Sequence, residues 1–149
     1  MPKFTLFHLC VVAASLYIVS AVTEEEIKAF RKAIRPIIET CSEEYGVVSG
    51  DVQTAKDNKD ANAVKPCFTE CVLRKIGILD TNGYYDAERG LHGLRKFVKN
   101  DEDFAKFQVV AMKCTKVNDI PVSKDETRCD RAMLVLGCGF DNIAEMPLK

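Results

Sequence analysis

The sequence predicts an all-α fold, a compact bundle of about six helices. Apolar residues recur at helical spacing in successive segments from residue 23 onward, and no segment shows the apolar–polar alternation of a β-strand. Turn residues and two helix-start motifs separate these segments. Six cysteines follow an N-terminal secretory signal, which is typical of a domain stabilised by disulfides.

The first 21 residues have the layout of a secretory signal peptide. Lys3 precedes the almost wholly apolar run 4–19, and the small residues 19–21 form a cleavage site. A membrane anchor is the competing interpretation, because about 17–25 apolar residues span a bilayer. The cleavage site and the switch to the polar stretch 23–26 favour removal. We therefore expect one secreted domain over residues 22–149.

Composition excludes several classes of function. The chain of 149 residues carries 21 Lys and Arg against 22 Asp and Glu, interleaved throughout, so we expect no nucleic-acid partner. The apolar share of 47% excludes intrinsic disorder. One histidine, His92, remains after cleavage, and it has no adjacent Cys or Asp. The acidic residues 101–103 fit a helix start rather than an acid–base pair, so we expect neither an enzyme nor a cofactor.

The N-terminal half of the domain predicts three helices. Residues 23–26 form a capping box that opens the first helix, whose apolar stripe reaches Cys41. Pro36 lies inside this stripe and is expected to kink or split the helix. A short helix of poor pattern is expected over residues 49–57. Residues 61–79 repeat apolar positions at helical spacing and predict the third helix.

Three more helices are expected in the C-terminal half. The fourth covers residues 86–98, and the fifth runs from 101 to 117, before a proline. A second capping box at residues 123–126 predicts the start of the sixth helix. Its five consecutive apolar residues 132–136 leave it no polar face. This helix must therefore lie buried at the centre of the bundle.

The spacing of the cysteines restricts their pairing. From Cys41 onward, 25, 3, 42, 14 and 8 residues separate successive cysteines. Cys67 and Cys71 stack on one helical face about 5–6 Å apart, too far for a disulfide. Cys129 and Cys138 lie on opposite faces of the last helix. The third helix is therefore tied to two other places and the sixth is held from both sides, while several connectivities stay open.

A metal site is the alternative use of these cysteines. The close pair Cys67 and Cys71 has a spacing that zinc sites use. No second close pair follows, and secretion disfavours free thiolates. We therefore expect no metal.

This cysteine spacing on a secreted helical chain resembles the six-cysteine insect odorant-binding proteins of the pheromone/general odorant-binding family. The segment from Pro66 to Gly77 is also similar to the third-helix segment of that family. The resemblance covers residues 22–149, although the absence of tryptophan departs from it. It implies an internal apolar cavity that carries a small hydrophobic ligand, an odorant or pheromone, through aqueous lymph. It also implies three interlocked disulfides: Cys41–Cys71, Cys67–Cys129 and Cys114–Cys138.

The resemblance places the walls of this cavity mainly on the fourth, fifth and sixth helices. Methionines are included because thioethers adapt to varied ligand shapes. Gly139 can end the last helix, and the apolar tail 139–149 is then expected to form a lid or wall over the cavity. The candidate lining residues are Phe68, Leu91, Leu94, Val98, Phe107, Val110, Ala111, Met112, Met133, Leu136 and Phe140.

Three functions remain open at this point. The first is an odorant or pheromone carrier in sensillum lymph, with an odorant receptor at the neuron surface as its downstream partner and a weak homodimer as its assembly. The second is a carrier of the same fold for amines, lipids or hormones in another secretion. The third is a rigid secreted interaction module with a filled core.

Overall fold

The computed structural model describes residues 21–123 and 127–148, and its regular structure is helical. The α-helices are α2 (Glu24–Tyr45), α3 (Ser49–Asn58), α4 (Pro66–Lys75), α5 (Ala87–Leu94), α6 (Asp101–Lys113) and α7 (Thr127–Asp141). Short 3-10 helices are η1 (Ala61–Ala63), η2 (Cys114–Asp119) and η3 (Ile143–Glu145). Extended residues pair in the described part only at one isolated bridge, between Leu79 and Tyr85. The all-α prediction is confirmed.

The capping box at the start of α2 is formed as predicted. The Thr23 hydroxyl accepts from the Glu26 N–H, and the Glu26 carboxylate accepts from the Thr23 N–H. Pro36 does not split α2, which continues to Tyr45. A proline removes one donor from a helix, and neighbouring turns can hold the segment together when one face is buried.

The predicted helix over residues 61–79 is wrong in its limits. Lys65 is extended because it precedes a proline, and Pro66 takes the first helical position. The far end stops at Lys75, and Gly77 adopts a positive φ of 85° that breaks the helical path. The apolar spacing continues past both ends, so it could not show where the backbone turns.

Side-chain caps set the starts of α5 and α6. The Asp86 carboxylate accepts from Arg89 N–H, and the Asn100 side chain accepts from Asp103 N–H. Helix α5 ends at Leu94, earlier than expected, and α6 tightens into η2 at Cys114.

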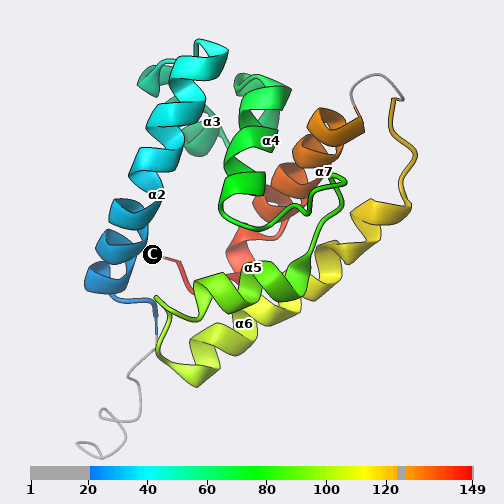
Figure 1. Cartoon of the computed structure of the whole chain (residues 1–149). Helices are drawn as coiled ribbons and strands as arrows, with labels where there is room; N and C mark the ends of the chain where they lie inside the picture. Colours follow the sequence, from blue (N-terminus) through cyan, green and yellow to red (C-terminus); the bar gives the residue numbers. More distant parts are fainter. Residues whose placement is uncertain (1–20, 124–126, 149) are drawn as a thin grey trace, which may run out of the picture.

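Helix α7 lies against α4 and contacts η1, η2 and η3 as well (Figure 1). Ala132 is fully buried and Val135 nearly so, in agreement with the predicted central position. The expected end at Gly139 is wrong, because α7 continues to Asp141 and Asn142 then donates its side-chain N–H to the Cys138 carbonyl. Most of the capping box at 123–126 lies outside the described residues, as do the first 20 residues of the expected signal peptide.

Three disulfides join these helices. Cys41–Cys71 links α2 to α4, Cys67–Cys129 links α4 to α7, and Cys114–Cys138 links η2 to α7. Helix α4 is thus tied to two other helices, and α7 is held at both ends. None of the helices in the described part of the chain has the length and hydropathy needed to cross a bilayer.

Candidate ligand-binding site

The described helices line a partly open cavity of about 550 Å³. Helix α2 contributes one face, at positions that helical periodicity brings into line: Phe30, Ala33, Ile34 and Ile37. Helix α4 and the loop after it contribute Leu73, Ile76, Ile78 and Tyr85. Helix α5 and the turn that follows contribute Ala87, Gly90, Leu91, Gly93, Leu94 and Phe97. The wall is therefore built mainly from hydrocarbon side chains.

The C-terminal half of the chain closes the cavity. Helices α6 and α7 contribute Phe107, Val110, Ala111, Val135, Leu136 and Phe140. The tail after α7 adds Ile143, Met146 and Leu148. The end of the chain lies beside α2 and α5 (Figure 1), so the tail forms part of the wall.

Seven of the candidate lining residues lie in this wall. They share the inward faces of α5, α6 and α7: Leu91, Leu94, Phe107, Val110, Ala111, Leu136 and Phe140. Helical periodicity within each segment brings them together. The same periodicity could not show that α2 faces the same space, because a stripe that lines a cavity and a stripe that fills a core have the same pattern.

The other four candidates lie outside this wall. Phe68 is buried in a separate cluster with Cys41 and Ala55, on the α2–α3 side of α4. Val98 is buried beyond the early end of α5. Met112 is 49% exposed on the outer face of α6. Met133 lies seven residues before Phe140 and so in line with it along α7, but it is not among the residues that line the cavity.

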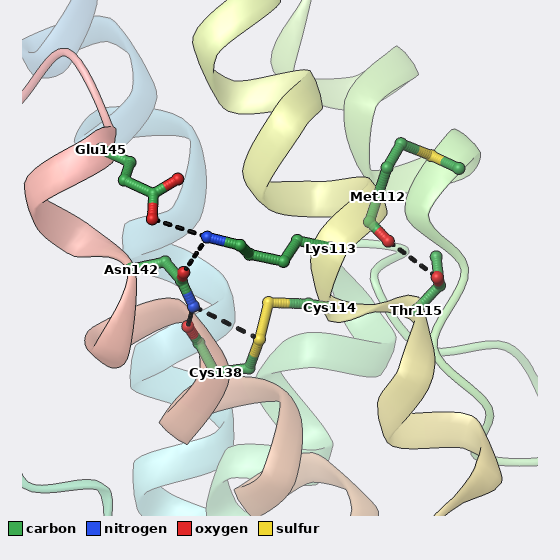
Figure 2. The surroundings of a disulfide bond; sticks show 7 residues. All are labelled: Met112, Lys113, Cys114, Thr115, Cys138, Asn142 and Glu145. Atoms are coloured by element: carbon green, nitrogen blue, oxygen red, sulfur yellow. Dashed lines mark hydrogen bonds and ion pairs between the residues drawn. A yellow bond between two sulfur atoms is a disulfide. The ribbon is translucent and has the colours of Figure 1, made fainter.

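Three side chains hold the tail against α6 next to a disulfide, as Figure 2 shows. The Lys113 ammonium is 2.6 Å from the Glu145 carboxylate and donates to the Asn142 side-chain oxygen at 2.9 Å. The Cys114–Cys138 disulfide lies directly beside this contact. At the other end of the tail, the Val22 N–H donates to the Pro147 carbonyl at 3.2 Å. We call the Lys113–Asn142–Glu145 group the tail contact.

The start of α2 is also held against the turn between α5 and α6. The Glu26 carboxylate accepts a hydrogen bond from the Lys99 backbone N–H at 2.8 Å. The backbone N–H groups of Thr23 and Lys99 lower the pKa of Glu26 below its usual value of 4.5. Phe30 meets Phe97 edge to face, with ring centroids 5.5 Å apart. These contacts fix α2 against the turn after α5.

Polar side chains are few around the cavity. Tyr85 and Lys96 are the polar or charged side chains among its described lining residues, which include no carboxylate. Burial raises the pKa of the Tyr85 phenol, and the neighbouring Asp86 charge raises it further. His92 is exposed on α5 and is not part of the wall. Within the described residues, no group of three or more His, Cys, Asp or Glu could hold a metal ion.

The likeness to known proteins agrees with this architecture. Residues 23–142 match the PBP/GOBP family along most of the chain. The chain belongs to the PBP/GOBP family. General odorant-binding protein 28a of Drosophila melanogaster is 30% identical to the chain over 102 residues, which are 68% of this chain and 69% of that relative.

A solved structure of an odorant-binding protein shows the same fold. The odorant-binding protein dmelOBP28a from Drosophila melanogaster superposes with a TM-score of 0.55 at 25% identity. The superposition covers 80% of this chain and 97% of that structure. The disulfide pairs of this PBP/GOBP chain are also those that the resemblance of its cysteine spacing implied.

Proposed function

We propose that this protein binds one small apolar molecule in the cavity and carries it through extracellular fluid. The observation that carries the proposal is the wall itself, in which side chains from five helices and the tail converge on about 550 Å³. Ligand sites of proteins span about 300–1,000 Å³ and are mostly apolar. A rigid module with a filled core would need no such space.

The size of the cavity supports a useful affinity. Burial of about ten methylene groups at about 0.8 kcal/mol each contributes about 8 kcal/mol before the cost of ordering the ligand. This corresponds to dissociation constants in the micromolar range. Three disulfides stiffen the wall, so little of this free energy is spent in reorganising the protein.

Membership of the PBP/GOBP family indicates which class of ligand the protein carries. A relative in the PBP/GOBP family is named an odorant-binding protein, so we propose an odorant or pheromone as the ligand. Three disulfides fit an oxidising, extracellular compartment, and the signal-like residues 1–21 fit secretion. We place the protein in sensillum lymph, where it would deliver its ligand to an olfactory receptor.

A filled-cavity variant tests the proposal. The chain has no tryptophan, so binding is followed with the neutral fluorescent probe N-phenyl-1-naphthylamine. Ala111→Phe adds a ring to the wall on α6, and we expect at least a tenfold rise in the dissociation constant of the probe. Ala105→Phe is the matched control, because Ala105 is exposed on the same helix. We expect no change in probe affinity for that variant.

The outcomes are distinct. Saturable binding at one site per chain, lost in the Ala111→Phe variant alone, supports the carrier. Absence of saturable binding to the wild-type protein, or equal binding by both variants, would contradict it. Far-ultraviolet circular dichroism checks that both variants keep the helix content of the wild type.

A further inference from the structure

The two polar side chains of the cavity lie at opposite ends of one helix. Tyr85 precedes α5 and Lys96 follows it. Because α5 has eight residues, it is about 12 Å long. One small polar group on a ligand can therefore reach only one of them. Lys96 is exposed, and a charge on an exposed lysine contributes little to binding.

The backbone of Tyr85 is fixed on both sides. Its N–H donates to the Asn118 side-chain oxygen, and its carbonyl accepts from the Asn118 side-chain nitrogen, both at 2.9 Å. Leu79, on the extended segment before the turn, pairs with Tyr85 in an isolated antiparallel bridge. The flanking bond from Asp86 N–H to the Ile78 carbonyl is 2.8 Å long. The ring of Tyr85 therefore enters the cavity wall from a rigid position.

The hydroxyl of Tyr85 is available to a ligand. It makes no hydrogen bond to another residue in the described ranges 21–123 and 127–148. Burial raises the pKa of this hydroxyl. A phenol in apolar surroundings stays protonated and can donate one hydrogen bond. Tyr85 is partly buried, and its hydroxyl is not among the fully buried side-chain atoms that lack a partner. A ligand without an acceptor would cover this donor and leave it unpaired, which is unfavourable, so an acceptor on the ligand would be selected.

We propose that Tyr85 is the specificity-determining hydrogen-bond donor of the cavity, and that it selects neutral ligands that carry a carbonyl oxygen, such as ketones, aldehydes and esters. This inference rests on the proposed carrier function. The carbonyl oxygen lies at the Tyr85 hydroxyl, and the alkyl chain extends along α5 toward Phe97. Protonated amines are disfavoured, because the described lining offers no carboxylate to pair with an ammonium.

Two ligands of equal shape test the hydrogen bond. 2-Undecanone and 2-methyl-1-undecene differ only in the C=O and C=CH₂ groups, and each is titrated against the bound N-phenyl-1-naphthylamine. Tyr85→Phe keeps the ring and removes the hydroxyl. We expect the dissociation constant of the ketone to rise about five- to tenfold and that of the alkene to stay within twofold.

The neighbouring tyrosine is the matched control. Tyr84 is exposed, and the guanidinium of Arg131 lies over its ring, 4.9 Å from the centroid, away from the cavity wall. Tyr84→Phe therefore removes a hydroxyl from the same loop, and both dissociation constants should be unchanged. Equal weakening of ketone and alkene by Tyr85→Phe, or weakening of neither, would overturn the proposed hydrogen bond.

Two charged ligands complete the test at neutral pH. Decylammonium should bind at least tenfold more weakly than 2-undecanone, and equal or tighter binding would overturn selection of neutral ligands. Decanoate that binds more tightly than the ketone and is sensitive to Lys96→Met would also overturn it. If the wild-type protein binds neither the probe nor any of these ligands, the carrier function itself fails. Binding that does not depend on Tyr85 contradicts only this inference.

Discussion

Glu26 connects the start of α2 to the turn between α5 and α6. Its carboxylate accepts hydrogen bonds from the backbone N–H groups of Thr23 and Lys99, both at 2.8 Å. These bonds favour the ionised form and lower its pKa in the folded protein. A lowered pKa contributes stability that is fully present above the usual value of 4.5 and is lost as the pH falls through the folded value.

Neutralising Glu26 should therefore destabilise the protein in a pH-dependent way. We expect Glu26→Gln to lower the melting temperature at pH 7 by about 3–6 °C, the cost of a weakened helix cap. At pH 3 the difference should be smaller than at pH 7, because protonation of the wild-type carboxylate removes the same charge as the pH falls through its lowered pKa. Glu25→Gln is the control, since Glu25 is exposed beside it. Thermal melts that show an equal difference at both pH values would contradict this explanation.

Lys113 makes the central interaction of the tail contact. Its ammonium binds Glu145 and Asn142, and both partners lie in or beside the tail that closes the cavity. We expect Lys113→Met to speed dissociation of N-phenyl-1-naphthylamine about two- to fivefold, because a partly exposed ion pair contributes about 0–1 kcal/mol. Stopped-flow displacement measures this rate. The difference from wild type should also shrink at high salt.

Lys106 provides the matched control for this lysine. It lies on the same helix, but its ion pairs are with Glu102 and Asp103 of α6 itself. Lys106→Met should leave the dissociation rate of the probe unchanged. The same acceleration in both variants would show that the charge of α6, rather than the tail contact, controls release.

The tail is the element whose removal tests the closure of the cavity. Deletion of residues 143–149 keeps α7 and its Asn142 cap but removes Ile143, Met146 and Leu148 from the wall. We expect at least tenfold weaker probe binding and faster dissociation, with helix content nearly intact. The effect should exceed that of Lys113→Met, because apolar wall is lost as well as the contact. Unchanged affinity and dissociation rate would show that the tail does not retain the ligand.

At the scale of elements, the sequence predicted which segments are helical better than where they end. Caps at Thr23, Asp86 and Asn100 are local interactions, so their residues could be recognised directly. The end of α4 depends on the positive φ of Gly77 and on the Leu79–Tyr85 bridge, which joins residues across a loop. Apolar periodicity contains no information on such pairing.

The cavity was predictable only in part, because residue spacing shows which residues share a helix face but not how the helices pack together. Phe107 and Ala111 share one face of α6, so their joint position follows from helix geometry. Helix α5 ends at Leu94, so Val98 no longer follows the helical face that lines the cavity. Tyr85 lies in the irregular loop before α5, where helical spacing does not apply. The contribution of α2 depends on how the helices pack together, which the spacing within one helix cannot show.

At the scale of the whole molecule, the disulfides have two separable effects. Cys67–Cys129 closes the longest loop, with a sequence separation of 62, and lies outside the cavity wall. Cys114–Cys138 has a separation of 24, but Cys114 lines the cavity and the bond lies beside the tail contact. The chain-entropy model gives about 4 kcal/mol for the longer loop and about 3.5 kcal/mol for the shorter one.

Removal of Cys67–Cys129 should therefore cost more stability, whereas removal of Cys114–Cys138 should cost more probe affinity. Replacing Cys67 and Cys129 together by alanine should lower the free energy of unfolding more, while probe affinity at low temperature stays within about twofold. Replacing Cys114 and Cys138 together should cost less stability but weaken probe binding about tenfold, because η2 and α7 lose their covalent link beside the wall and the tail contact. Urea unfolding and probe titration on the same samples measure both quantities. If affinity loss follows stability loss in both variants, the Cys114–Cys138 bond has no local part in shaping the cavity.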